Sequence, residues 1–375
     1  NVPNLRFPEF QGEWKRTIFK NVITLQRGSS PRPIIEYVTT SDDGVNWIKI
    51  GDMPHFGRIV TSTEEKITKE GAKKSRQVNK GDLILSNSMS YGLPYIMGID
   101  GYIHDGWFVL KNFENTFDKD YLCNLLISSA IQNQYKRLAA GGVVQNISSD
   151  LVNSVSVSIP TMMEQKKISS LLNLIDERIA TQNKIIEDLK KLKSAISHIL
   201  FSSKGAIHLS EIANVVMGQS PSSNAYNDQG LGMPLVQGNL DISNGKTTPR
   251  LYTAEFNQTT EKGNIILTVR APVGEVAKAT QKVCLGRGVC AIIPHEENMS
   301  DFIYQYLTFY KFMWRRYEQG STFTSINGSD VRNIFCPKVR NVSILTLLDI
   351  KINIEERVVK QYQSQKQYML YQMFI

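Results

Sequence analysis

The chain has 375 residues, of which 41% are hydrophobic and 21% are charged, and its formal net charge is +8. This length suggests two or three domains, and the hydrophobic content excludes a disordered chain. The positive charge is consistent with a polyanionic partner such as nucleic acid.

The sequence predicts a soluble cytoplasmic protein. The N-terminal stretch has no basic region followed by an apolar run, and no segment reaches the roughly 18 consecutive apolar residues of a membrane span. The cysteines have neither the spacing nor the neighbouring histidines of a metal site. We therefore expect no bound metal, and we expect reduced, mostly buried thiols at Cys123, Cys284, Cys290 and Cys336.

Each half of the chain predicts a mixed α/β domain. In the first half, WIKIGD, GDLILSN and VSVSIP are short apolar runs typical of buried strands. Helical spacing runs through DKDYLCNLLISSAIQNQYKRLAAGG, which begins with aspartates and stops at Gly141 and Gly142. The second half repeats these elements with GNIILTV, SDFIYQYLTFYKFMWRRYEQG and FCPKV.

A long helix is predicted after each domain. Residues 161–201 contain no glycine or proline, and a heptad seam steps through Ile168, Leu172, Ile175, Ile179, Ile186, Leu189, Ile196 and Leu200. Residues 343–375 also lack glycine and proline and carry Leu347, Ile354, Val358 and Tyr362 at similar spacing. We expect the two helices to pack antiparallel as a spacer. The alternatives are that each helix caps its own domain or drives dimerisation.

Segments of the first half recur in the second half in the same order, which indicates a duplicated unit. KGDLILSNSMSYGLP from Lys80 corresponds to KGNIILTVRAPVGEV from Lys262. The other pairs are GSSP with GQSP, IKIGDM with LVQGNL, DGWFVL with RGVCAI, and GGVVQNISSDL with GSTFTSINGSDV. The period is far too long for a solenoid. The predicted organisation is a domain over residues 1–160, a helix over 161–203, a second domain over 204–342 and a second helix over 343–375.

The sequence carries no motif for catalysis. It contains no GxxxxGK[ST] phosphate loop, no HExxH, no GxGxxG after a strand and no Asn-Pro-Pro-aromatic stretch. The histidines are scattered, and none has a nucleophile signature beside it. We therefore expect no catalysis by this chain alone.

The loops that follow the repeated strand keep their frame and change their side chains. SNSMSYG in the first copy becomes TVRAPVG in the second, as two readings of a similar surface would require. The guanidinium of Arg270 could donate two hydrogen bonds to guanine, and the amide of Asn87 could pair bidentately with adenine. Taken singly, each such residue is more simply interpreted as a solvated loop position. The candidate DNA-contacting residues are Arg27, Ser29, Lys49, Ser86, Asn87, Ser88, Tyr91, Gln145, Gln219, Gln237, Asn239, Arg270, Arg287, Thr322 and Thr324.

Basic residues near these loops are candidates for contacts to phosphates. Such contacts would set the register of the protein on DNA without reading its sequence, although a run of charge is also common on a solvated face. These residues are Lys73, Lys74, Arg76, Arg287, Arg315 and Arg316.

With these features together, the chain resembles the specificity subunit of a type I restriction-modification system over nearly its whole length. The resemblance is carried by GEWKRTIFKNVITLQRGSSP, SIPTMMEQKKISSLLNLIDERIATQ, KGNIILTVRAPVGEV, LGRGVCAI and GSTFTSINGSDV. The first copy departs from the fuller frame at SNSMSYGLP, and the second helix lacks the EQ pair and is shorter.

The resemblance implies that each domain is a target recognition domain that reads one half of a split, asymmetric DNA site. The two domains would face DNA alike under a pseudo-twofold, and the helices would set the gap and dock two methyltransferase subunits. The helix residues implied in docking are Ile168, Leu172, Ile175, Ile179, Ile186, Leu189, Leu347, Ile354 and Val358. The methyltransferase would bind S-adenosylmethionine, and restriction subunits that use ATP and Mg would join the complex. This chain would bind no cofactor and would not be an enzyme.

Without the resemblance, a second hypothesis stays open, in which twin domains on a helical stalk bind protein or glycan. A nuclease or methyltransferase acting alone is a third hypothesis, which lacks motifs. DNA affinity that weakens with salt separates the first hypothesis from the second.

Overall fold

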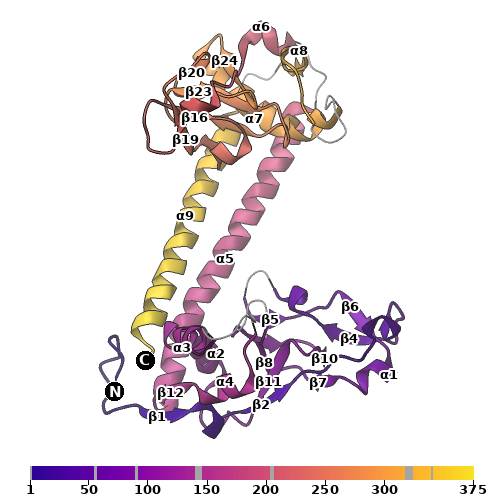
Figure 1. Ribbon diagram of the computed structural model, residues 1–375, viewed down its shortest axis with the longest axis vertical. Coiled ribbons are helices and arrows are strands. Elements are labelled where there is room, and N and C mark those ends of the chain that lie inside the picture. Colours follow the sequence, from indigo (N-terminus) through magenta and orange to yellow (C-terminus); the bar gives the residue numbers. More distant parts are fainter. Residues whose placement is uncertain are drawn as a thin grey trace. The chain divides into compact units, whose positions relative to one another are not determined.

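The computed structural model describes residues 2–54, 57–88, 92–139, 146–202, 207–316, 324–338 and 341–375, except for the side chains of residues 139 and 315. Its contacts divide the chain into two compact units. Unit 1 comprises Asn1–Lys184 and Glu356–Ile375, and unit 2 comprises Ile185–Glu355. Each unit therefore holds one α/β domain and part of each long helix (Figure 1).

Within the described residues, unit 1 contains two five-stranded sheets and one two-stranded sheet. The first sheet has the order β2 (Thr24–Arg27), β11 (Trp107–Lys111), β8 (Leu83–Ser86), β9 (Pro94–Met97) and β5 (Ile59–Val60). The second has the order β3 (Val38–Thr39), β6 (Glu65–Ile67), β4 (Val45–Ile48), β10 (Gly101–Ile103) and β7 (Arg76–Val78). The small sheet pairs β1 (Lys15–Ile18) with β12 (Ser156–Ile159). The short helices are η1 (Phe19–Asn21), η2 (Ile34–Glu36), η3 (Ile50–Asp52), α1 (Lys69–Ala72), α2 (Lys119–Ile127), α3 (Ser129–Ala139) and α4 (Ser149–Ser154).

The described part of unit 2 repeats this plan. Its first sheet has the order β14 (Ala213–Met217), β24 (Val289–Pro294), β21 (Ile265–Thr268), β22 (Val276–Lys278), β18 (Lys246–Thr247) and β17 (Ile242–Ser243). Its second has the order β15 (Tyr226–Asn227), β19 (Leu251–Thr253), β16 (Met233–Val236), β23 (Val283–Leu285) and β20 (Thr259–Thr260). The small sheet pairs β13 (Ile207–His208) with β25 (Phe335–Cys336). The short helices are α6 (Leu209–Ile212), η4 (Ser223–Ala225), η5 (Asn239–Asp241), η6 (Glu297–Met299), α7 (Ser300–Tyr310), η7 (Lys311–Arg316) and α8 (Gly328–Arg332).

The duplication predicted from the sequence is confirmed by the sheet topology. Matching strands of the second sheets appear in the same spatial order in both units. The repeated strands β8 and β21 are buried at every residue, as their apolar runs predicted. Each of these strands pairs antiparallel with its neighbours on both sides. The two α/β domains are therefore copies of one fold.

The helix predicted from Asp118 onward is interrupted in the structure. It consists of α2 and α3, separated by Ser128, whose backbone is extended with φ −64° and ψ 153°. The Ser128 hydroxyl donates to the carbonyl of Leu125 at 2.6 Å. Serine side chains compete in this way with the helical backbone pattern, and apolar spacing does not reveal it. The corresponding helix of unit 2 changes at Lys311 from α7 to the 3-10 helix η7.

The two long helices are α5 (Met162–Phe201) and α9 (Ser343–Gln372), and they run antiparallel within each unit. In unit 1, Lys366 Nζ lies 2.7 Å from Asp176 Oδ2. The guanidinium of Arg178 lies 5.9 Å from the ring centroid of Tyr362. In unit 2, the amine of Lys193 lies 2.6 Å from Asp349 Oδ1, and Phe201 shares a core with Leu345. Residue numbers rise along one helix as they fall along the other in both units.

The predicted seam of α5 lies partly inside the domain cores. Ile168 and Leu172 belong to the core of unit 1, and Ile175 is 6% exposed. The seam predicted on α9 is wrong at Leu347 and Ile354, which are 63% and 47% exposed, whereas Val358 and Tyr362 are half-buried. The buried residues of α9 include Leu345 and Ile352, each two residues before an exposed predicted position, and Val359 and Leu370. This helix has two weak apolar stripes, and its spacing alone does not show which one is buried.

The EQ pair at the start of α5 binds the helix to its own domain. Glu164 is fully buried, and its carboxylate accepts bonds from Arg6 at 2.7 and 2.9 Å. Gln165 accepts the backbone N–H of Asp118 at 2.9 Å and donates to the carbonyl of Thr116 at 2.9 Å. A carboxylate in the first turn also complements the positive end of the helix. The pair is therefore part of the architecture of unit 1.

Candidate nucleic-acid interface

The loops at the ends of β8 and β21 are held by matching main-chain hydrogen bonds. In unit 1, the N–H of Asn87 donates to the carbonyl of Gly106 at 2.9 Å. In unit 2, the N–H of Val269 donates to the carbonyl of Gly288 at 2.9 Å. Five further bonds of this kind recur: those from Ser86, Gly92, Trp107, Gly28 and Ile147 match those from Thr268, Gly274, Val289, Gly218 and Ile326. Because these bonds involve backbone atoms, the loops keep one shape while their side chains differ.

A tight turn precedes β11 in unit 1 and β24 in unit 2. The N–H of Trp107 donates to the carbonyl of His104 at 3.3 Å, and the N–H of Val289 donates to that of Gly286 at 3.1 Å. The second residue of the turn is Asp105 in unit 1 and Arg287 in unit 2. The correspondence of DGWFVL with RGVCAI is therefore confirmed in the structure, with opposite charges at its first position.

One correspondence within the duplication needs correction by a single residue. The sequence repeat matched Ile48 with Leu235, but β4 and β16 pair with their neighbours in a different register. Ile48 lies beside Ile103 in β10, and Val236 lies beside Leu285 in β23. The residue that follows each strand is therefore Lys49 in unit 1 and Gln237 in unit 2. A shift of one residue on a strand reverses the side-chain face, so this correction changes which residues are compared.

Ser86 and Asn87 lie inside unit 1 and not at its surface. They are 1% and 3% exposed. The amide nitrogen of Asn87 donates to the carbonyl of Asp105 at 2.9 Å, and the Ser86 hydroxyl accepts the N–H of Leu93 at 3.1 Å. Thr268 holds the matching loop of unit 2 in the same way, by accepting the N–H of Glu275 at 2.9 Å. These side chains support the loop, whereas Ser88 is half-buried at its surface.

The remaining candidates of unit 1 make internal contacts. The guanidinium of Arg27 donates to the carbonyl of Asp105 at 3.3 Å, and the Ser29 hydroxyl donates to that of Lys74 at 3.1 Å. The amine of Lys49 lies 2.7 Å from the carboxylate of Glu65, a hydrogen bond that raises the pKa of Lys49.

Asp105 is a half-buried acid of this surface. Its carboxylate accepts the Ser30 hydroxyl at 2.7 Å and lies 2.9 Å from the Arg32 guanidinium. The pKa of Asp105 is lowered, first by the Ser30 bond and further by Arg32. Its side chain is 42% exposed, so a negative charge remains accessible at this position.

Unit 2 has a cavity of about 340 Å³ beside Arg287, which corresponds to Asp105 of unit 1. Four of the predicted residues line it: Gln237, Asn239, Arg270 and Arg287. Its floor includes Asp241, a buried carboxylate that accepts the N–H of Gln237 at 2.8 Å and the guanidinium of Arg250 at 3.0 Å. Gln219 is exposed but does not line the cavity. Sequence reasoning missed Asp241 and Arg250, because their roles depend on a turn closed by η5.

Three predicted residues, Tyr91, Gln145 and Thr322, lie outside the described residues. Thr324 is described, and its carbonyl accepts the N–H of Ala271 at 3.0 Å, next to Arg270.

The predicted phosphate contacts are mostly exposed. Lys73, Lys74, Arg76 and Arg316 have exposed side chains, and the side chain of Arg315 is outside the described set. The amine of Lys74 contacts the Tyr37 hydroxyl and lies 4.6 Å from the centroid of its ring. Arg76 donates to the carbonyl of Arg27 at 3.2 Å.

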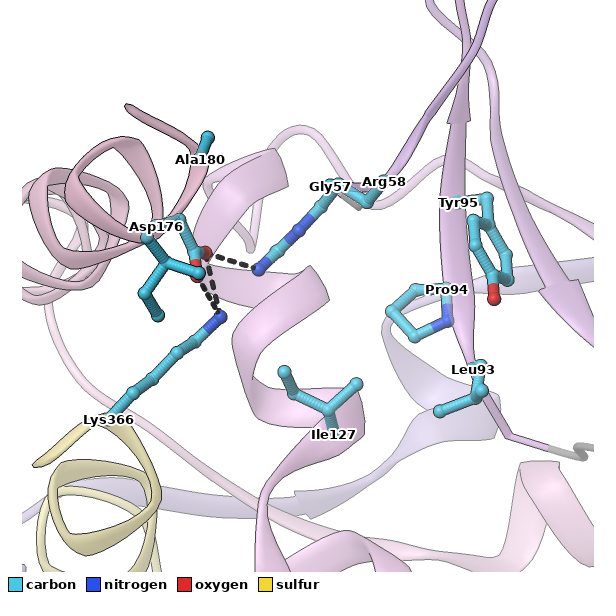
Figure 2. Close-up of a pocket in the computed structure, with 10 residues that line it drawn as sticks. Gly57, Arg58, Leu93, Pro94, Tyr95, Ile127, Asp176, Ala180 and Lys366 are labelled. Carbon is cyan, nitrogen blue, oxygen red and sulfur yellow. Dashed lines mark hydrogen bonds and ion pairs between the residues drawn. The ribbon is translucent and has the colours of Figure 1, made fainter. Parts of the chain in front are cut away.

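A second cavity, of about 240 Å³, lies in unit 1 beside α5 and α9. Arg58 and Lys366 both point toward Asp176 there, as Figure 2 shows. Arg58 Nη2 lies 3.1 Å from Asp176 Oδ2. The predicted residue Ile179 lines this cavity, and Ile186 of unit 2 is 8% exposed.

The described residues contain no group of three or more side chains suited to a metal ion. No described helix is long and apolar enough to cross a membrane. The four cysteines are free and buried, as predicted. Burial raises the pKa of Cys123 to about 11 and those of Cys290 and Cys336 to about 12, which disfavours reactive thiolates.

One family model matches both copies of the domain. The type I restriction modification DNA specificity domain matches residues 12–191 and 205–361, so both copies and most of the chain are covered. The chain belongs to this family.

A curated relative and two solved structures are similar to this chain. A relative from Methanocaldococcus jannaschii, described as the type I restriction enzyme MjaX specificity subunit, is 29% identical over 334 residues. The match covers 81% of this chain and 76% of that protein. The type I restriction-modification system S subunit from M. genitalium has a TM-score of 0.62 at 18% identity, covering 100% of this chain and 99% of that one.

A second solved chain comes from work on complex assembly and conformational transition of the type I R-M system. It has a TM-score of 0.64 at 21% identity, with coverage of 96% of this chain and 97% of that one. At these identities the two structures show a shared fold.

Proposed function

We propose that this chain is the DNA-recognition subunit of a type I restriction-modification complex and that each unit reads one half of a bipartite, asymmetric site. The main support is the pair of loops with one backbone frame and different side chains, built on β8 and β21. A common frame would present both surfaces to DNA alike, and different side chains would read different bases.

In this proposal the long helices fix the separation of the half-sites and dock two methyltransferase subunits. Leu347 and Ile354 of α9 support docking, because they are large apolar side chains exposed on a helix. Restriction subunits would join the same complex. The partners would supply the chemistry: S-adenosylmethionine on the methyltransferase, and ATP and Mg on the restriction subunit. This chain would bind no cofactor, would catalyse no reaction and would work in the cytoplasm, where the DNA is.

A genome-wide map of methylated bases tests this function. Cells would express the methyltransferase partner with and without this chain, and the maps would be compared. A split, asymmetric adenine motif that depends on the chain supports the proposal. Identical maps, with the chain expressed and the methyltransferase active, would contradict it and favour a protein or glycan ligand.

A further inference from the structure

The cavity of unit 2 brings together two arginines at the end of one strand pair. Thr268 of β21 lies opposite Val289 of β24, and the bond from the N–H of Val269 to the carbonyl of Gly288 continues this register. Arg270 follows Val269 and Arg287 precedes Gly288, so both arginines lie just beyond the paired residues. Both side chains are exposed and line the same cavity.

Neither guanidinium has an ion pair or hydrogen bond among the described residues. Like charges that line one cavity repel each other. A ligand rich in acceptor atoms would relieve this repulsion. Arg250, the third arginine of the cavity, is different, because Asp241 already holds its guanidinium at 3.0 Å.

The backbone of unit 2 holds Arg287 at a fixed place. The flanking glycines pack closely against the neighbouring strand: a Cβ on Gly288 would lie 2.1 Å from the carbonyl oxygen of Gln237, and one on Gly286 would lie 3.1 Å from its Cα. The N–H of Arg287 donates to the Ser220 hydroxyl at 3.1 Å. The side chain of Arg287 is exposed beyond this closely packed backbone, which suits a residue that must meet one base.

Unit 1 shows which of the two positions can read sequence. Ser88 of unit 1 corresponds to Arg270, and Asp105 corresponds to Arg287. Serine and arginine both donate to phosphates, so the first position suits the DNA backbone, which is the same at every site. Aspartate repels phosphate. A position that is negative in one unit and positive in the other cannot contact phosphate in both units. It suits a residue that reads a base.

We propose that the turn position occupied by Asp105 in unit 1 and Arg287 in unit 2 determines specificity, and that Arg287 reads a guanine in the half-site bound by unit 2. This inference rests on the proposed function. The guanidinium fork of Arg287 would donate to O6 and N7 of guanine in the major groove, while Arg270 contacts a phosphate. Asp105 offers acceptors instead and therefore disfavours guanine at the matching place of the other half-site.

The test uses the chain in complex with its methyltransferase and begins with the wild-type methylation map. Arg287→Lys keeps the charge and loses the fork, so we expect discrimination for guanine over other bases at one position to fall by about 5- to 100-fold. The other half-site should be unchanged. Arg270→Lys is the matched variant in the same cavity, and because a point charge satisfies a phosphate, it should keep the motif.

Modified DNA tests the contact with the wild-type complex and does not depend on the folding of any variant. The probe is a duplex of the mapped motif in which 7-deazaguanine, which lacks N7, replaces guanine in one half-site. Binding should weaken about 5-fold or more at the guanine that Arg287 reads. Inosine keeps O6 and N7 and should bind normally.

The outcomes separate this proposal from the function on which it rests. A split motif with no guanine in the half-site that responds to Arg287→Lys overturns the proposal and leaves the function standing. So does equal weakening at all sequences, which is the signature of a phosphate contact. If the wild-type chain directs no motif at all, the proposed function itself fails.

Discussion

Lys366 and Asp176 join the two long helices inside unit 1, with 2.7 Å between Nζ and Oδ2 (Figure 2). Arg58 approaches the same carboxylate, so one anion compensates two cations. Their side chains are 15%, 33% and 17% exposed for Lys366, Asp176 and Arg58. Burial lowers the pKa of Lys366, although the neighbouring Asp176 favours its charged form.

Removal of this anion should destabilise unit 1. We expect Asp176→Asn to lower the free energy of unfolding by about 1–3 kcal/mol, less than a fully buried pair would lose because Asp176 is a third exposed. Lys366→Met should cost less, since it keeps the apolar stem and removes the charge. Urea denaturation measures both. Glu187→Gln breaks an exposed pair with Lys191 on α5 and should change stability by under about 0.5 kcal/mol. An equally small effect for Asp176→Asn would contradict the expectation.

Gly28 should tolerate no side chain. A Cβ there would lie 2.0 Å from the carbonyl oxygen of His104, and one on its counterpart Gly218 would lie 2.1 Å from that of Gly286. We expect Gly28→Ala to destabilise the protein by about 1–3 kcal/mol, since the backbone of the turn from His104 to Trp107 must move. Gly51→Ala is the control, because nothing lies within 4 Å of its added Cβ. Thermal unfolding compares the two, and equal midpoints would argue against a close approach at Gly28.

His104 should make unit 1 less stable at acidic pH. Its Nδ1 accepts the N–H of Gly106 at 2.7 Å, which requires an unprotonated nitrogen. Burial is the main cause that lowers its pKa below the ordinary 6.5, against the opposing effects of Asp105 and Asp52, and Lys49 lowers it further. The unfolded chain therefore takes up a proton before the folded one does. The stability that comes from neutral His104 is fully present above pH 6.5. It is lost as the pH falls through the lowered pKa of His104 in the folded protein.

Stability measured against pH for the wild type and for His104→Asn tests this. Asparagine can still accept the N–H of Gly106 but does not titrate, so the variant should lose less stability on acidification. Parallel curves for the wild type and His104→Asn would rule out this role.

Exchange of one recognition domain should change one half of the methylated motif. Residues 20–160 would be replaced by the corresponding segment of another family member, and the methylated sites would be mapped. We expect a new half-site joined to the old one at an unchanged gap, because residues 204–342 and both helices are retained. A change in both halves would sink the modular interpretation.

Much of this architecture could be predicted from the sequence, because apolar runs, glycine positions and the duplication all bear on backbone structure. The strands β8 and β21 and the helix α5 followed from such patterns. The break at Ser128 and the buried stripe of α9 did not, because a hydroxyl bond and the choice between two weak stripes depend on packing.

The candidate site was predicted less well than the fold. The sequence could place Asn87 in the correct loop. It could not show that the Asn87 amide donates a hydrogen bond to the carbonyl of Asp105. The sequence repeat matched Ile48 with Leu235 because the neighbouring residues are similar. The pairing of β4 and β16 with their neighbours instead matches Ile48 with Val236. Arg270 and Arg287 were both named from the sequence, but that they line one cavity depends on the antiparallel pairing of β21 with β24.

The matching main-chain bonds around β8 and β21 have a consequence for how such a protein can change. Folding of the loops depends on atoms that every residue possesses, whereas the half-buried Asp105 and the exposed Arg287 differ in side-chain identity. Under our proposal, a substitution at Asp105 or Arg287 changes the base that is read and leaves these main-chain bonds in place. Stability and target choice can vary independently, so a lineage carrying this chain can acquire new DNA targets while keeping a working scaffold.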